Sequence, residues 1–165
     1  MSGSRLTRCF FIALLGLALT SCGFRLAGSS VLPPQLSQIY LVTSDISERQ
    51  RNALSKRLER AGAKVSGQPL AQSVQLSVRL KVLPDRRQVT SASNGTTVET
   101  LARSLTYGLR DADGQILLPA KTLTQQKNIV FDDDNLLSST AEKSSVVVDI
   151  EAALFNQLIH QLNRI

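Results

Sequence analysis

The segment from Val74 to Val82 alternates apolar and polar residues without a break. Successive side chains of a β-strand point to opposite faces of a sheet, so this pattern predicts a strand with an apolar face on a core. The other face is polar and must meet water or a partner. The chain is therefore expected to build a sheet that is covered on one side only, with Pro84 ending this strand.

Two helices and three further strands are predicted around this segment. The first helix follows a capping box at Asp45 and Glu48 and is ended by Gly62, and the second follows the box Ser139-Thr140-Ala141-Glu142. Residues at helical spacing form a predicted stripe on the second helix: Val146, Val147, Ile150, Ala153, Leu154, Leu158, Gln161, Leu162 and Ile165. In the strand that begins at Val98, one face is predicted to carry Leu101, Leu105, Tyr107 and Leu109. The order strand, helix, three strands, helix predicts an α+β domain in which two helices pack on one face of a four-stranded sheet. The predicted helices cover Ile46–Ala61 and residues 139–165, and the first three strands cover Ser37–Val42, Val74–Val82 and Val98–Arg110. The last strand is predicted in two segments, Gln115–Leu118 and Thr122–Phe131, with Pro119 between them at an edge position or bulge.

The first 21 residues have the layout of a secretory signal. Arg5 and Arg8 precede an apolar run of 11 residues, Cys9 to Leu19, whereas a membrane span needs about 20. The run ends in Leu19-Thr20-Ser21-Cys22, which resembles the lipobox of bacterial lipoproteins. That resemblance implies cleavage before Cys22 and its modification with fatty acyl chains such as palmitate. Because Gly23 follows the cysteine where inner-membrane lipoproteins commonly have Asp, it also implies sorting to the outer membrane.

Three other roles for Cys22 are alternatives to lipidation. These are a buried cysteine in a core helix, a disulfide or metal pair with Cys9, and a nucleophile that uses the single histidine, His160. Cys9 leaves with the signal, so the mature chain has no disulfide. The expected organisation is a signal peptide (1–21), an acylated tether (22–36) outside the core and one domain (37–165), since removing 21 residues from 165 leaves 144.

No enzyme or metal signature is recognised, so we expect neither a catalytic activity nor a cofactor. His160 lies on an amphipathic helix without a triad pattern, which favours an exposed helix residue over a general base. Asp111-Ala112-Asp113-Gly114 begins like a calcium loop, but its glycine comes too early and it reads better as a hairpin turn. The run Asp132-Asp133-Asp134 is more typical of a solvated strand end than of a metal site.

The charge balance favours an anionic partner only weakly. The signal carries two of the 19 basic residues and none of the 13 acidic ones, so the mature chain has 17 against 13, a net charge of +4. The absence of tryptophan argues against stacking on single-stranded nucleic acid. Candidate phosphate contacts, with an ordinary solvated face as the alternative, are Arg79, Lys81, Arg86, Arg87 and Lys143.

The stretch Cys22-Gly23-Phe24-Arg25-Leu26, with Phe131-Asp132 and Thr140-Ala141-Glu142 before a long last helix, resembles the lipopolysaccharide-assembly lipoprotein family LptE. The resemblance implies a non-catalytic outer-membrane lipoprotein that plugs the LptD β-barrel, assists its assembly and binds lipopolysaccharide. Ser93 and Thr140 stand where that family has basic residues, and Arg86, Arg87 and Lys143 would have to compensate. Two alternatives stay open: an auxiliary lipoprotein of another envelope lipid-transport system, and a lipid-anchored hydrolase that uses His160.

Overall fold

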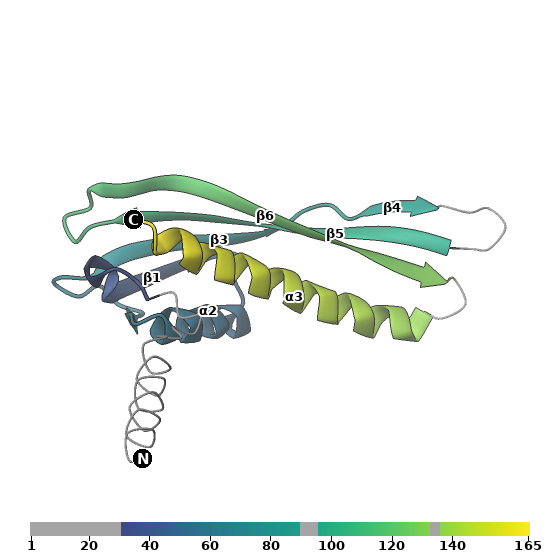
Figure 1. Cartoon of the computed structure of the whole chain (residues 1–165), viewed down its shortest axis with the longest axis horizontal. Coiled ribbons are helices and arrows are strands. Elements are labelled where there is room, and N and C mark those ends of the chain that lie inside the picture. Colours follow the sequence, from purple (N-terminus) through teal and green to yellow (C-terminus); the bar gives the residue numbers. More distant parts are fainter. Residues whose placement is uncertain (1–30, 90–95, 133–135) are drawn as a thin grey trace, which may run out of the picture.

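The computed structural model describes residues 31–89, 96–132 and 136–165. Its elements follow the predicted order of a strand, a helix, a run of strands and a last helix (Figure 1). They are η1 (Pro34–Leu36), β1 (Gln38–Ser44), α2 (Glu48–Arg60), β2 (Lys64–Ser66), β3 (Val74–Val82), β4 (Arg86–Val89), β5 (Thr96–Arg110), β6 (Ile116–Asp132) and α3 (Leu136–Leu162).

All six strands belong to one mixed sheet. β1 lies between β2 and β3 and pairs with both in parallel, while β5 pairs antiparallel with β3, β4 and β6. β3 and β4 pair with successive parts of β5, residues 103–110 and 97–100, so together they form one long strand that is broken at residues 83–85. The predicted α+β class is confirmed, but the predicted count of four strands is wrong.

The two additional strands carry weak sequence signals. β2 has three residues, too few to show a period, and β4 reads Arg-Arg-Gln-Val, which is mostly polar. Both strands form because their backbones pair with a neighbouring strand: β2 pairs with β1, and β4 pairs with β5. Tertiary pairing thus decides these two segments, and local preference does not.

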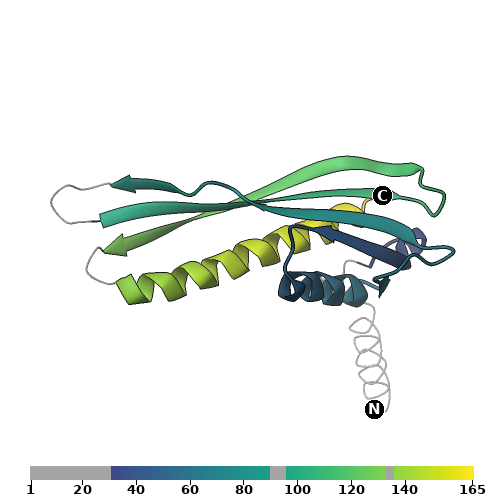
Figure 2. The same cartoon turned by 180° about the vertical axis from the view of Figure 1, so that it is seen from behind.

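Both helices lie on the same side of the sheet, as Figures 1 and 2 show from opposite directions. The alternation in β3 places Val74, Leu76, Val78 and Leu80 in the core beneath them, as predicted. In β5 the buried face includes Leu101, Leu105, Tyr107 and Leu109, which also share a face in the sequence prediction. Burial of these apolar side chains is the main stabilising term of the fold.

The first helix begins two residues later than predicted. Its N-cap is Ser47, whose hydroxyl accepts from the backbone N–H of Gln50, while the Gln50 side chain accepts from the backbone N–H of Ser47. The predicted box of Asp45 and Glu48 is therefore wrong. Asp45 instead takes a left-handed conformation with φ of 56°, which Asp adopts more readily than most residues.

The last strand crosses Pro119 without ending. Tyr107 of β5 pairs with Lys121 and Leu109 pairs with Leu118, so Pro119 and Ala120 together lie opposite Gly108. Two residues opposite one is a β-bulge, and β6 pairs with β5 alone among the described strands. The prediction of an edge position or bulge for Pro119 is confirmed on both counts.

The last helix starts at Leu136, before the predicted capping box, and has 27 residues. The predicted stripe residues Ile150, Leu154, Leu158 and Leu162 are at most 1% exposed. Phe155 and Ile159 are buried as well, whereas Ala153 and Ile165 of the predicted stripe are exposed. In the described part of the chain, no helix combines the length and hydropathy that a membrane span requires.

The segment before β1 also contributes to the core. Leu32 and Leu36 are 6% and 3% exposed, and the backbone N–H of Leu32 donates to the carbonyl oxygen of Ala61 over 2.8 Å. The expectation that the core leaves out the tether is therefore wrong for these two leucines. Residues 22–30, including Cys22, lie outside the described residues.

Candidate functional site

The side of the sheet opposite the helices forms an uncovered surface, called the open face below. Outward-pointing residues of β3, β5 and β6 alternate with the buried ones and are mostly small hydroxyl or amide side chains. Two cross-strand pairs show their regular arrangement: the hydroxyls of Thr106 and Thr122 lie 2.9 Å apart, and Thr100 donates to Asn128 over 2.9 Å. The face is therefore wet and hydrogen-bonding in character.

Charge on the open face has a single sign. Strand register and exposure place five cations on it, and no carboxylate points outward from the described strand residues whose side chains are placed. Just beyond β1, a carboxylate oxygen of Asp45 lies 3.4 Å from Nε of Arg79. The five cations are Lys64, Arg79, Lys81, Arg86 and Arg110.

The five candidate phosphate contacts fall into two sets. Arg79, Lys81 and Arg86 are on the open face, whereas Arg87 and Lys143 lie on the helix side of the sheet. In the described residues, neither Lys81 nor Arg86 forms an ion pair, so their charges face solvent. The structure therefore does not gather the five residues into one site.

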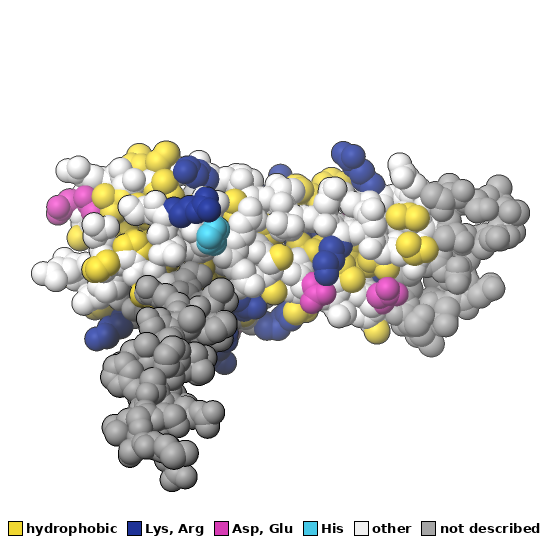
Figure 3. All heavy atoms as spheres, viewed as in Figure 1, with side chains coloured by type: hydrophobic (Ala, Val, Ile, Leu, Met, Phe, Trp, Pro, Cys, Tyr) yellow, Lys and Arg dark blue, Asp and Glu magenta, His cyan; other side chains and the backbone are white. Residues whose placement is uncertain are grey.

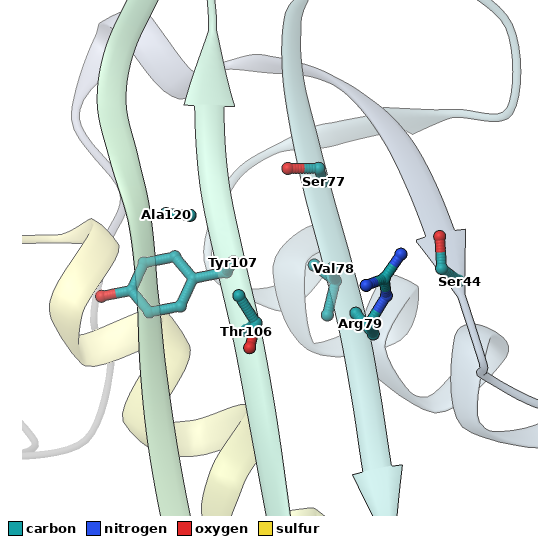
Figure 4. Close-up of a pocket in the computed structure, with 7 residues that line it drawn as sticks. All are labelled: Ser44, Ser77, Val78, Arg79, Thr106, Tyr107 and Ala120. Carbon is teal, nitrogen blue, oxygen red and sulfur yellow. The ribbon is translucent and has the colours of Figure 1, made fainter.

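A hollow of about 200 Å³ lies on the open face around Gly108 (Figure 4). Ser44, Ser77, Arg79, Thr106 and Ala120 border it. Gly108 lies beside the hollow, and a Cβ there would come 3.4 Å from the Leu118 carbonyl oxygen across the bulge. Ser77 donates to the Gly108 carbonyl over 3.2 Å, which fixes one wall of the hollow.

Tyr107 contributes to the same region from the other side of the sheet. Its ring points away from the open face in Figure 4, and its side chain is 2% exposed. Burial raises the pKa of its hydroxyl, so Tyr107 stays neutral across the physiological range. We therefore assign it to the core and not to the chemistry of the hollow.

A second hollow, of about 290 Å³, lies where the chain breaks between β3 and β4. Leu83 and Pro84 form the break, and Arg86, Thr100 and Thr124 are among the residues that border the hollow. Each hollow thus combines one arginine with threonine hydroxyls. This is a donor set suited to phosphate or to a polar protein surface.

Glu99 forms two ion pairs with described residues on the helix side of the sheet, where β4 pairs with β5. It is 4% exposed, and its Oε2 lies 2.5 Å from Nζ of Lys143 and 3.4 Å from Nε of Arg87. The cluster joins α3 and β4 through a single carboxylate of β5. Glu99 was not predicted from the sequence. Its position two residues before Leu101 on β5 places it on the buried face of the strand, and this was the only indication of its role.

We expect Lys143→Met to lower the free energy of unfolding by about 2 kcal/mol, because among the described residues it leaves the buried Glu99 carboxylate with the exposed Arg87 alone as a partner. Urea denaturation of the purified chain measures this loss. Lys143→Arg keeps the charge and should stay near the wild type, and Lys121→Met changes an exposed lysine as a matched control. Equal stabilities of Lys143→Met and Lys121→Met would contradict a structural role for the pair.

The remaining sequence candidates do not form a reactive centre. One carboxylate oxygen of Asp111 accepts the backbone N–H of Asp113 and of Gln115, which confirms the hairpin turn. His160 is exposed, and the histidine is visible in cyan at the surface in Figure 3. No group of three metal-ligating side chains occurs among the described residues. Ser93, Asp133 and Asp134 lie outside them, and the Asp132 side chain is not placed.

Comparison with solved structures finds the same fold in bacterial lipoproteins. A minor lipoprotein of Acinetobacter baumannii superposes with a TM-score of 0.63 at 19% identity, covering 78% of this chain and 92% of that one. Lipoprotein B of Nitrosomonas europaea also gives a TM-score of 0.63, at 18% identity, covering 86% of this chain and 90% of its own. The chain has the LptE-like lipoprotein fold.

The comparison extends over the LptE-like domain and not over a fragment of it, because about nine-tenths of each relative is covered. No protein-family model and no curated protein sequence matches the chain. At below one-fifth identity the likeness concerns the fold alone. The function must therefore be argued from the surfaces of this chain.

Proposed function

We propose that the chain is an outer-membrane lipoprotein of the lipopolysaccharide translocon. It plugs the lumen of the LptD β-barrel, assists assembly of that barrel and binds lipopolysaccharide on its way to the cell surface. The lipobox at Cys22 and the LptE-like fold support this proposal. The observation that carries it is the open face, where the described strand residues with placed side chains present cations and no outward carboxylate.

The open face suits the inside of a large barrel. Barrel lumens are polar and wet, so a plug needs a flat hydrogen-bonding surface and not an apolar one. Threonine, serine and amide side chains supply donors and acceptors in register across β3, β5 and β6. The apolar residues on the helix side are buried in the core, whereas no described helix covers the open face.

The cations of the open face suit an anionic partner. Lys81 and Arg86 lie on consecutive strands that pair with β5, and each faces solvent. Either phosphates of lipopolysaccharide or carboxylates of a barrel wall would complement them through charge-assisted hydrogen bonds. Arg79 is partly neutralised by Asp45, so we assign it a smaller share of the charge.

Co-purification tests the proposal. A tagged, acylated chain extracted from outer membranes in detergent should bring down a large barrel protein. The double variant Lys81→Glu with Arg86→Glu should recover about tenfold less barrel, since it places carboxylates on a surface selected for cations. Lys56→Glu with Arg60→Glu, which changes two exposed cations of α2, is the matched control and should behave like the wild type.

Recovery of the chain alone, with the barrel present and intact in the same extract, would contradict the proposal. Recovery of a transport ATPase and a periplasmic carrier would instead favour the second reading, an auxiliary lipoprotein of another envelope lipid-transport system. Loss of the barrel in both double variants would show that binding depends on the total charge of the chain and not on the cations of the open face.

A further inference from the structure

Exposed apolar side chains gather at one end of the domain. Eight large hydrophobic residues are exposed in the described chain, and five of them lie where α3 and the β5–β6 hairpin end, at the left of Figure 1 and the right of Figure 2. Figure 3 shows hydrophobic atoms in yellow at this end. The five, called the apolar end below, are Val31, Leu70, Ile116, Leu117 and Ile165, each between 49% and 62% exposed.

Different elements bring these residues together, so the cluster does not come from one loose segment. Leu70 closes the turn before β3, where its N–H and carbonyl both bond to the Ser73 hydroxyl. Ile116 and Leu117 begin β6, with Ile116 in register with Arg110. Val31 adjoins Leu32, whose backbone is fixed to the end of α2.

The charges around the apolar end nearly cancel. The exposed cations there are Arg60, Lys64, Arg110 and Arg164, and the acids are the exposed Glu59 and Asp113 and the half-buried Asp111. Asp111 is occupied within its own turn by two backbone N–H groups. A partner of this end is therefore recognised by apolar contact more than by net charge, and its binding should change little with salt.

The position of the predicted anchor indicates what covers this end. The described chain begins at Val31, and eight residues, 23–30, separate it from Cys22. A chain of that length spans at most about 30 Å even when fully extended. If Cys22 is acylated, the apolar end is the part of the domain that is held nearest to the bilayer.

We propose that the apolar end seats on the surface of the membrane that carries the anchor. Its side chains enter the boundary between headgroups and acyl chains, as the apolar faces of interfacial helices do. The sheet then leads away from the membrane: β5 has 15 residues, which corresponds to about 50 Å, and it places the Glu99 cluster at the far end. This proposal rests on acylation of Cys22 and not on the barrel partner.

Tryptophan fluorescence tests the seating, because the chain has no tryptophan of its own. Leu117→Trp and Val130→Trp place a probe at opposite ends of β6, at residues that are 49% and 59% exposed. The acylated full-length variants are reconstituted into vesicles of phosphatidylethanolamine and phosphatidylglycerol with brominated acyl chains. We expect about twofold quenching for Leu117→Trp and almost none for Val130→Trp, since interfacial side chains reach about 5–10 Å into the bilayer.

Two further measurements distinguish apolar from electrostatic contact with the vesicle. Adding Ile116→Asp to Leu117→Trp should restore the tryptophan emission. Raising the salt concentration should leave the emission quenched. Ile165→Trp is the second probe should Leu117→Trp fail to fold by circular dichroism. Equal quenching at both ends of β6, the absence of quenching at the apolar end, or an unmodified Cys22 by mass spectrometry would each overturn the proposal. No barrel is present in the vesicles, so these outcomes are independent of the co-purification result.

Discussion

Phe155→Ala should lower the free energy of unfolding by about 4 kcal/mol, the typical cost of truncating a fully buried aromatic ring. The Phe155 side chain is 1% exposed and lies where α3 meets α2, with the guanidinium carbon of Arg57 5.8 Å from the ring centroid. Next to it, buried Glu151 accepts from Gln50 and Arg49 of α2. Loss of the ring opens a cavity where the two helices meet.

Urea denaturation followed by circular dichroism measures this effect. Asn156→Ala, at the neighbouring exposed position, should change the stability by less than about 0.5 kcal/mol. Phe155→Leu, which refills most of the space, should cost about 1 kcal/mol. A loss below about 1 kcal/mol for Phe155→Ala would show that the helices do not pack through this ring.

Cys22→Ala should abolish acylation altogether and leave the signal attached, because the thiol is the group that the lipoprotein pathway modifies before cleavage. Mass spectrometry of the membrane fraction would then show a chain that keeps residues 1–21 and gains no acyl mass. The described domain should still fold, since its core begins at Leu32.

Cys9→Ala is the matched control for this prediction. Cys9 lies in the apolar run and leaves with the signal, so its removal should not alter the mature product. A normally processed and acylated Cys22→Ala chain would refute the lipobox interpretation. It would also remove the anchor on which the seating of the apolar end depends.

The fold could be predicted from the sequence wherever one periodic face meets the core. Apolar residues recur regularly along β3, β5 and α3. Leu76, Leu105 and Leu154, which this spacing places in the core, are buried. The short strand β2 and the polar strand β4 could not be predicted, because hydrogen bonds from neighbouring strands hold them. Phe155 was also missed, because the stripe predicted for the last helix describes packing against one neighbour, whereas α3 contacts both the sheet and α2.

The candidate site was only partly predictable. The alternation in β3 correctly assigns Arg79 and Lys81 to the polar face, but Arg86 and Arg87 are adjacent in sequence and point to opposite sides of a strand that was not predicted. Lys143 pairs with Glu99 across two elements far apart in the sequence. Because such pairs arise from packing, residue types alone could not separate a structural lysine from a phosphate ligand.

The length of β6 has a consequence for the behaviour of many copies on one membrane. An edge strand of 17 residues offers a long row of backbone groups to a second edge, and acyl anchors would confine the copies to two dimensions, where such encounters are frequent. Pro119 and the bulge interrupt that row near one end, and Lys127, held by Asp149 at 2.9 Å, places a charge along it. The edge is thereby protected against self-association while the open face remains available.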